Sequence, residues 1–472
     1  MTAPTSLTIV GAGPAGYPAA FLAADLGLSV TLVDSAAALG GTCLHRGCIP
    51  SKSLLHAARI LADAREAAAI GLDFAPPAIR LEKLRAWKES VTDRLAQGLA
   101  QLAKARGVRV VQARAAFASP TQLRLTAPDG SAAAHDFDAL LLATGSVPAR
   151  PAAFPADHPH LWDSTAAPEL SEVPESLLVV GGGYIGLELG SVYAALGARV
   201  TVVEMTGGLL PGADRDLIVP LAKRLRGLFQ AIHLNTRVAG VADDPAGLRV
   251  VLENVQTGEK REEAFAKVLV SVGRRPWTDG LDLDKAGIAV TDRGFIAVDE
   301  TGRTANARVF AAGDVAGNPM LAHKATHEAR ALVARLAGRA AHALAPVPAV
   351  VFTDPEIAWV GLTETQAKEE GREIKVSKFP WAASGRALTL DRADGVTKIL
   401  ADPGTGQLLG VAIAGPGAGD LISEASLALA SGATAADLAR AIHPHPTLAE
   451  TLGEAAELHA GLCAHLYRPA KR

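Results

Sequence analysis

The stretch Leu7-Thr-Ile-Val-Gly-Ala-Gly-Pro-Ala-Gly16 predicts the fold, because a strand-like apolar run ends directly in three spaced glycines. Residues 17–26 form an alanine-rich segment with helical propensity, and a second strand-like run at 29–33 ends in Asp34, 23 residues after Gly11. Glycines in this spacing let the backbone approach a pyrophosphate at the helix N-terminus, and the acid accepts from a ribose hydroxyl. The stretch therefore predicts a strand, a turn and a helix that bind the adenosine half of a dinucleotide.

The same pattern is repeated at residues 176–204. A strand-like run leads into Gly181-Gly-Gly-Tyr-Ile-Gly186, and Glu204 stands 23 residues after Gly181, at the end of a second run. Two such units indicate two dinucleotides with hydride transfer between them. Glu204 would repel a 2′-phosphate, and residues 205–210 contain no arginine to bind one. The second unit therefore favours NAD over NADP.

Length and composition limit the alternatives. At 472 residues the chain exceeds the usual size of a single hydrophobic core, so several domains are expected. A hydrophobic content of 49%, a charged content of 20% and a net charge of −3 are ordinary for a globular protein and give no sign of nucleic-acid binding. No apolar run is long enough to span a bilayer, and the first residues lack the basic segment of a signal peptide. A cytoplasmic protein is expected.

The remaining segments connect and extend the two units. Apolar residues at helical spacing predict helices over residues 54–70 and 81–106. Short apolar runs predict strands at residues 108–111, 138–142, 267–272 and 309–312. Prolines between residues 148 and 159 mark a crossing from the first domain to the second, and the region after Pro346 has no nucleotide-binding signature.

A third stretch, Gly41-Thr-Cys-Leu-His-Arg-Gly-Cys-Ile-Pro-Ser-Lys52, contains two of the three cysteines. Cys43 and Cys48 enclose four residues and Cys463 is distant, so soft ligands are too few for zinc and no metal is predicted. A disulfide that opens and closes fits better, because a helix N-terminus and the cation of Lys52 stabilise thiolates. On this stretch alone, two unreactive buried cysteines remain an alternative.

His445 is the candidate base. Glu450 lies five residues later, within reach to orient the imidazole, and the flanking prolines stiffen the loop. A carboxylate on one ring nitrogen fixes the tautomer and raises the basicity of the other, which abstraction of a thiol proton requires. His323 and His443 have no such arrangement and are interpreted as ordinary polar residues.

These stretches together resemble the FAD-dependent pyridine nucleotide-disulfide oxidoreductases over nearly the whole chain, and within them the dihydrolipoamide dehydrogenases, the E3 components of 2-oxoacid dehydrogenase complexes. The resemblance is carried by residues 40–52, 181–188, 311–315, 320–324 and 443–450. It implies an α/β fold with two Rossmann-like domains and an α+β C-terminal dimerisation domain. It assigns residues 1–150 and 275–345 to FAD binding, 151–274 to NAD binding, and 346–472 to the dimer interface.

The resemblance also implies individual site residues. The cofactors are FAD and NAD, and no metal is implied. The residues matching the FAD site are Gly11, Gly13, Gly16, Asp34, Thr42, Lys52, Ala115, Gly145, Asp314 and Ala322. The residues matching the NAD site are Gly181, Gly183, Gly186, Glu204, Val238 and Gly273. Ala115 lies where relatives often carry a glycine.

The chemistry implied by the resemblance is reoxidation of protein-bound dihydrolipoyl groups. His445 of a second subunit deprotonates a substrate thiol, which attacks Cys43, and Cys48 passes the electrons to FAD and then NAD⁺. Glu450 supports the base, and Lys52 pairs with Glu188 beside the flavin, so the catalytic set comprises Cys43, Cys48, His445, Glu450, Lys52 and Glu188. A homodimer follows, whose partners are lipoyl domains or E2/E1 components of 2-oxoacid complexes, or a glycine-cleavage carrier. Tyr184, in the second glycine turn, is a candidate gate over the flavin.

Two alternatives remain at this point. Another reductase of the same superfamily would carry an NADP-binding arginine pair, as in glutathione-type enzymes, or adjacent C-terminal cysteines, as in mercuric reductases; Cys463 stands alone. A flavoprotein redox sensor or scaffold would show slow turnover, against which the complete base and second nucleotide motif argue.

Overall fold

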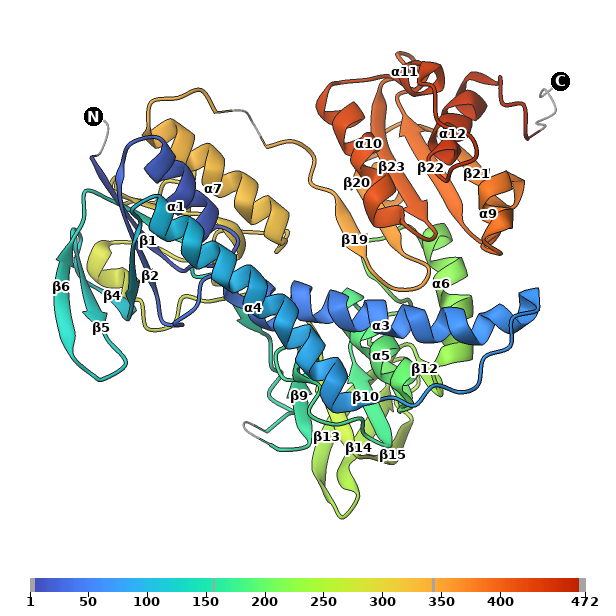
Figure 1. The fold of residues 1–472 in the computed structure, drawn as a ribbon, viewed down its shortest axis with the longest axis horizontal. Coiled ribbons are helices and arrows are strands. Elements are labelled where there is room, and N and C mark those ends of the chain that lie inside the picture. The colour runs from blue at the N-terminus through green and yellow to red at the C-terminus, as the bar shows by residue number, and fades with distance from the viewer. Residues whose placement is uncertain (1–4, 156–157, 342–343, 467–472) are drawn as a thin grey trace.

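The computed structural model describes residues 5–155, 158–341 and 344–466. The first unit is a parallel five-stranded sheet in the order β18-β7-β1-β2-β3 (Figure 1). Strands β1, β7 and β18 are almost fully buried, as expected for a sheet covered on both faces, whereas the edge strand β3 is mostly exposed. The five strands are β1 (Ser6–Val10), β2 (Ser29–Asp34), β3 (Arg109–Gln112), β7 (Ala139–Leu142) and β18 (Val309–Ala311). Residues near the start of the chain and residues near 310 therefore share one sheet.

Helices and a small sheet complete the first unit. α1 (Gly16–Asp25) packs against α7 (Ala322–Leu336) through alanines of both helices, which lets the two axes approach closely. α4 (Leu81–Ala105) runs beside them. The antiparallel sheet β4-β5-β6 consists of β4 (Arg114–Ser119), β5 (Gln122–Thr126) and β6 (Ala132–Asp136).

The second unit repeats the parallel design in the order β12-β11-β10-β16-β9. Its strands are β9 (Leu161–Asp163), β10 (Ser176–Val180), β11 (Arg199–Val203), β12 (Ala231–His233) and β16 (Lys267–Val270). Two helices and an antiparallel sheet accompany them: α5 (Tyr184–Leu196), α6 (Arg215–Leu228), β13 (Thr236–Asp244), β14 (Gly247–Asn254) and β15 (Lys260–Phe265). A two-stranded pair, β8 (Ser146–Pro148) with β17 (Arg274–Pro276), marks where the chain leaves and re-enters the first unit.

The third region is an antiparallel sheet in the order β19-β20-β23-β22-β21. Its strands are β19 (Ala349–Val351), β20 (Ile357–Gly361), β21 (Lys375–Pro380), β22 (Val396–Ala401) and β23 (Leu408–Ala414). Its helices are α8 (Glu364–Glu369), α9 (Gly385–Thr389), α10 (Ala418–Ala430), α11 (Ala435–Arg440) and α12 (Glu450–Ala460). Alternate residues of β23 face opposite ways: Val411 and Ile413 pack with α10 and α12, whereas Ala412 and Ala414 join the core of the second unit.

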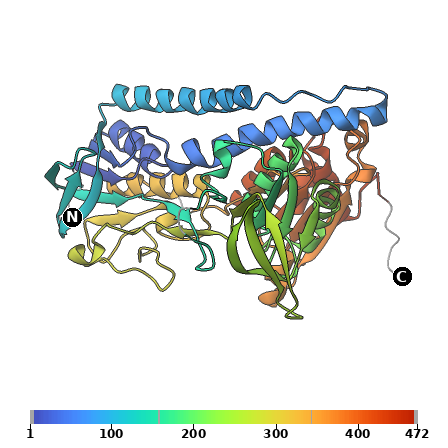
Figure 2. The ribbon, with the colours of Figure 1, turned by 90° about the horizontal axis from the view of Figure 1, so that it is seen from below.

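The cysteine stretch forms α2 (Gly41–Arg46) and α3 (Cys48–Glu66), and Figure 2 shows α3 and α4 running along one side of the molecule. The helix expected at 54–70 begins six residues earlier and ends at Glu66, where a 3₁₀ turn over Ala67–Ile70 follows. Pro50 is tolerated because the first turn of a helix leaves its N–H groups without intrahelical partners. The predicted fold class, two Rossmann-like domains with an α+β domain, is confirmed. Within the described ranges, no helix has the length and apolar character needed to cross a bilayer.

Candidate active site

Cys43 and Cys48 form a thiol pair at the junction of α2 and α3. Both are reduced, and Cys43 Sγ donates a hydrogen bond to Cys48 Sγ at 2.7 Å. That bond, together with the cation of Lys52 one helical turn away, lowers the pKa of Cys48 to about 7 although burial opposes the shift. The same bond and burial raise the pKa of Cys43. The two sulfurs are therefore chemically unequal, and Cys48 is the one that carries a thiolate near neutral pH.

Lys52 and Glu188 form an ion pair beside the thiols. Lys52 Nζ lies 2.8 Å from Glu188 Oε2, and the Glu188 side chain is buried. The other carboxylate oxygen accepts from the N–H of Phe352 at 2.9 Å, and Lys52 Nζ also lies 4.5 Å from the centre of the Phe352 ring. Phe352 was not predicted, because its place beside Glu188 depends on contacts 164 residues apart in sequence. These contacts hold the lysine in one position next to Cys48.

A cavity of about 1090 Å³ opens beside the thiol pair. It extends from the first glycine turn past α2 to the N-terminus of α7. The predicted residues that line it are Gly11, Gly13, Asp34, Thr42, Cys43, Cys48, Lys52, Gly145, Glu188, Asp314 and Ala322. The structure therefore brings together residues from five separate parts of the sequence, with both thiols at the wall of the same cavity.

The first glycine turn fits a dinucleotide. A Cβ on Gly11 would lie 2.2 Å from the carbonyl oxygen of Ala143, and one on Gly16 would lie 1.7 Å from the oxygen of Gly11, so both positions must lack a side chain. A Cβ on Gly13 would meet only the Cα of Gly41, at 3.8 Å, and this backbone is left open to the cavity. The turn leads into α1, whose N-terminal N–H groups attract a phosphate. The cavity's size and its donors suit FAD.

The two acids after the second strands brace their glycine turns. Asp34 accepts from the N–H of Ala12 at 2.6 Å and from the N–H of Ala36 at 2.8 Å. Glu204 likewise accepts from the N–H of Gly182 at 2.7 Å. The sequence pattern predicted these carboxylates as ribose acceptors, and the structure adds a second task for each, which is to tie the end of a strand to the turn.

The second glycine turn repeats the geometry of the first. A Cβ on Gly181 would lie 2.6 Å from Ser271 O, and one on Gly186 would lie 2.3 Å from Gly181 O, whereas a Cβ on Gly183 or Gly273 would meet nothing within 4 Å. The crowded glycines permit close packing of strand and helix, and the open ones leave room for a ligand.

The first arginine that follows the second acid in the sequence is already engaged. Arg215 donates to the backbone oxygens of Leu209, Leu210 and Ala213. Its guanidinium is thereby held by three backbone oxygens. This arrangement suits the free ribose hydroxyls of NAD better than a 2′-phosphate.

Ala115 and Val238, predicted as cofactor contacts, do not line the cavity. Ala115, in β4, packs against the core of the first unit, while its neighbours Ala113 and Arg114 line the cavity. Val238, in β13, is paired with Leu252 across the antiparallel sheet and packs against the core of the second unit. Both assignments stay predictions.

Asp314 is held by residues that sequence reasoning missed. Ser146 Oγ donates to Asp314 Oδ2 at 2.6 Å, and Arg274 donates to Ser146 Oγ and Ser146 O at 2.7 Å each. The Gly273-Arg274 pattern after a strand was the one local sequence signal for the contact between Arg274 and Ser146.

Tyr184 also faces the cavity with 38% of its surface exposed, yet exclusion of water around the hydroxyl raises its pKa to about 12. Its phenol therefore stays neutral.

His445 and Glu450 form the predicted dyad at the start of α12, whose first residue is Glu450. His445 Nδ1 lies 2.8 Å from Glu450 Oε1, and Glu450 Oε2 accepts from the N–H of Thr447 at 2.7 Å. Partial burial raises the pKa of Glu450, but these two hydrogen bonds outweigh it and leave the pKa lowered. The imidazole is 79% exposed. The other ring nitrogen, Nε2, is therefore open to an external group.

The dyad is not part of this chain's own cavity. Among the described residues, those that line the cavity end at Ala325, and none comes from the antiparallel region that carries His445. His443 has a different environment: its side chain is largely buried, and its Nε2 lies 2.9 Å from Glu424 Oε1. Its position agrees with its interpretation as an ordinary structural residue.

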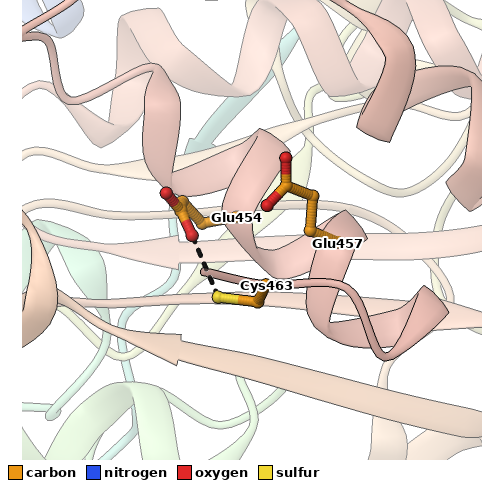
Figure 3. A group of neighbouring side chains, drawn as sticks. All are labelled: Glu454, Glu457 and Cys463. Atoms are coloured by element: carbon orange, nitrogen blue, oxygen red, sulfur yellow. Dashed lines mark hydrogen bonds between the residues drawn. The ribbon is translucent and has the colours of Figure 1, made fainter. Parts of the chain in front are cut away.

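Cys463 lies apart from the redox pair, where the chain folds back on α12 (Figure 3). Its Sγ donates to Glu454 Oε2 at 3.0 Å, and Glu457 lies beside both. Burial and the carboxylate of Glu454 raise the pKa of Cys463 to about 11. This thiol is protonated at neutral pH and is a poor nucleophile.

The sequence matches two family descriptions that together span this architecture. Residues 5–329 match the pyridine nucleotide-disulphide oxidoreductases, and residues 347–456 match the dimerisation domain of the same enzymes. The chain belongs to the pyridine nucleotide-disulphide oxidoreductases. This family uses FAD and NAD(H).

Named relatives and solved structures agree with this membership. The chain is 44% identical over 459 residues to a dihydrolipoyl dehydrogenase of Haemophilus influenzae, covering 97% of this chain and 95% of the relative. It is 45% identical over 452 residues to one of Thermus scotoductus, covering 96% of each. The crystal structure of LpdA from Mycobacterium tuberculosis superposes with a TM-score of 0.88 at 28% identity, covering 96% of this chain and 99% of that one. The flavoprotein disulfide reductase RclA from Escherichia coli, in a Cu(II) complex, superposes with a TM-score of 0.85 at 29% identity, covering 96% of this chain and 99% of that one.

Proposed function

We propose that this protein is an NAD-dependent dihydrolipoyl dehydrogenase, which oxidises protein-bound dihydrolipoyl groups to the cyclic disulfide. The observation that carries the proposal is the unequal thiol pair, Cys43 and Cys48, at the wall of a cavity that fits FAD. Relatives 43–45% identical over nearly the full length are named dihydrolipoyl dehydrogenases.

The cofactor assignments follow the two glycine turns. FAD belongs in the cavity beside the thiols, and NAD belongs at the turn that begins at Gly181. When bound, FAD supplies a two-electron acceptor for the dithiol and NAD⁺ supplies the final hydride acceptor. Lys52, fixed by Glu188 and by the ring of Phe352, holds a positive charge beside Cys48.

The thiol steps use the asymmetry of the pair. A substrate thiolate attacks Cys43 Sγ of the oxidised pair, the Cys43–Cys48 bond breaks, and Cys48 leaves as a thiolate. Because its pKa is near 7, Cys48 is a good leaving group. The second substrate thiolate then attacks the substrate sulfur of the mixed disulfide, which closes the lipoyl ring and releases Cys43. Cys43, whose pKa is raised, recovers a proton at that point.

His445 handles the substrate protons. Its Nε2 accepts the proton of a dihydrolipoyl thiol while Glu450 holds Nδ1 and stabilises the resulting imidazolium. The dyad is supplied by a second copy of the chain, which agrees with its exposure and with the match of residues 347–456 to a dimerisation domain. We therefore propose a homodimer as the active form.

The partners we propose are lipoyl domains of a 2-oxoacid dehydrogenase complex or of a glycine-cleavage carrier. A lipoyl group on a flexible arm can reach thiols at a cavity wall. Free glutathione is a small molecule and needs no such arm. A cytoplasmic location is proposed with them, because a dithiol that cycles in each turnover is typical of catalytic cysteines in reducing compartments.

Turnover assays test the proposal directly. The purified holoenzyme is expected to form NADH from dihydrolipoamide and NAD⁺, with a much lower rate for NADP⁺ and none for reduced glutathione. Cys43→Ser is the matched inactive control, and Cys463→Ser should retain the rate of the native chain. If dihydrolipoamide supports no NADH formation by a protein that has retained its flavin, the substrate assignment is wrong.

A further inference from the structure

Arg46 is an exposed side chain at the cavity wall, and none of the described residues forms a hydrogen bond or ion pair with its cation. Five basic side chains line the cavity: His45, Arg46, Lys52, Arg114 and Arg274. Three have partners, since His45 Nε2 lies 2.9 Å from Leu39 O, Lys52 pairs with Glu188, and Arg274 donates to Ser146. Within the described part of the chain, no hydrogen bond or ion pair to protein engages Arg46 or Arg114. An unpaired guanidinium in a ligand cavity points to an anionic group on the ligand.

The position of α2 places Arg46 on the phosphate side of the cavity. α2 begins at Gly41, which packs directly on the first glycine turn, because a Cβ on Gly41 would lie 2.5 Å from Gly13 Cα. Thr42 and Arg46 are four residues apart and both line the cavity, whereas Leu44 faces the core and is buried. Arg46 is thus one helical turn from the surface that meets the glycine turn.

Arg114 is placed at the other end of the same ligand. It follows Ala113, whose N–H donates to the backbone oxygen of Asp34 at 2.8 Å. Asp34 marks the adenosine ribose in this type of turn. The two unpaired arginines therefore flank different parts of the dinucleotide, and only Arg46 is on the helix that packs on the glycine turn.

We propose that Arg46 binds the diphosphate of FAD and so adds a side-chain contact to those of the glycine turn and α1. A guanidinium can meet two phosphate oxygens at once, which an ammonium cannot. The inference rests on the proposed function in one respect, namely that the cavity holds FAD. It adds that retention of FAD depends on a charge that sits between the two redox cysteines in sequence.

Flavin retention tests the proposal without measuring turnover. Native holoenzyme and the Arg46→Lys, Arg46→Ala and Arg114→Ala variants are diluted at a series of salt concentrations, and flavin released into the ultrafiltrate is followed with time. Arg330→Ala, an exposed arginine on the outer face of α7, is the surface control. Arg46→Ala should release FAD about tenfold faster or more at low salt, and Arg46→Lys should fall between it and the native chain.

The salt dependence separates a diphosphate contact from general destabilisation. Release from the native chain should accelerate with salt, while Arg46→Ala should show a weaker dependence because the screened contact is already lost. The Arg330→Ala control should match the native chain. Equal release rates and equal salt dependence for Arg46→Ala and the native chain would overturn the proposal.

The flavin and KM measurements also separate Arg46 from the cavity as a whole. If Arg46→Ala keeps its flavin but raises KM for a lipoyl domain, Arg46 serves the protein partner and the proposal is wrong. If the native chain itself holds no FAD, the proposed function fails as well, which distinguishes that failure from one confined to Arg46.

Discussion

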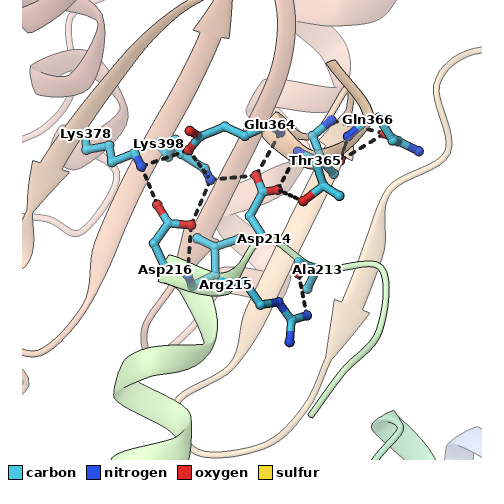
Figure 4. A network of polar contacts seen from close by, with 11 residues as sticks. Ala213, Asp214, Arg215, Asp216, Glu364, Thr365, Gln366, Lys378 and Lys398 are labelled. Carbon is cyan, nitrogen blue, oxygen red and sulfur yellow. Dashed lines mark hydrogen bonds and ion pairs between the residues drawn. The ribbon is translucent and has the colours of Figure 1, made fainter. Parts of the chain in front are cut away.

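Lys398 is a buried cation that joins the second unit to the antiparallel region (Figure 4). Its side chain is 0% exposed, and Nζ lies 2.6 Å from Asp214 Oδ2, 2.9 Å from Asp216 Oδ1 and 2.8 Å from Glu364 Oε1. Asp214 also accepts from the N–H groups at the start of α8. Lys378 contacts Asp216 and Glu364 from a position that is 40% exposed. One ammonium therefore connects β22, α6 and α8.

Replacing Lys398 by Met leaves the carboxylates without their buried counter-charge. Removal of one partner of a buried ion pair costs about 3–5 kcal/mol, because the remaining charge stays desolvated. Lys378→Met removes a partly exposed cation from the same cluster. An exposed ion pair contributes roughly 0–1 kcal/mol to the free energy of unfolding. For a chain of 472 residues we expect Lys398→Met to lower the thermal midpoint by roughly 3–5 °C and Lys378→Met to change it little.

The pH dependence gives this prediction a second test. Burial raises the pKa values of Asp214 and Asp216, but the lysines outweigh it and leave both lowered. Their contribution to stability is therefore present above the unfolded pKa, about 4, and is lost as pH falls through the lower folded value. In Lys398→Met this contribution is absent, so the gap in thermal midpoint from the native chain should narrow in acid. Equal midpoints for Lys398→Met and Lys378→Met at neutral pH would refute the argument.

Three further predictions concern the redox site. In the reduced protein, thiolate absorbance should rise with a midpoint near pH 7, and Cys48→Ser should abolish this titration while Cys463→Ser leaves it intact. Glu450→Gln should lower kcat for dihydrolipoamide about a hundredfold, with flavin retention unchanged, and Glu457→Gln on the same helix should have little effect. If Tyr184 gates the flavin, Tyr184→Ala should change the rate at which NADH reduces it in stopped flow, whereas an unchanged rate rejects the gate.

The parallel units were predictable because their signals are local. Strand-like apolar runs and glycine turns placed β1, β2, β10 and β11 within a residue or so of their observed bounds. The antiparallel region has no comparable motif, so its strand order could not be derived. The start of α3 was also missed, because Cys48-Ile-Pro50 does not look like a helix until the tolerance of proline in the first turn is considered.

Contacts between distant segments were the part of the site that sequence could not give. The pairing of Lys52 with Glu188 came from the resemblance, but the N–H of Phe352 on the same carboxylate had no local signal. The same holds for Lys398, which is 184 residues from Asp214 and would be expected on the surface from composition alone. A buried charge is recognisable only when its partners are known.

The separation of the dithiol from the base leads to a last prediction. The cavity with Cys43 draws no described lining residue from beyond Ala325, and His445 is 79% exposed on the antiparallel region. If each site combines Cys43 of one chain with His445 of another, a mixed dimer of Cys43→Ser and His445→Gln chains contains one intact site and one doubly damaged site.

Mixing the two inactive variants therefore distinguishes a shared site from a self-contained one. After random exchange of subunits, half of the dimers are mixed and each has one of its two sites intact, so the mixture should recover about a quarter of the native activity. A site built within one chain predicts no recovery, because every chain in the mixture is damaged. Exchange is checked independently with differently tagged chains, and inactivity of a mixture whose dimers have demonstrably exchanged would show that the base and the dithiol belong to the same chain.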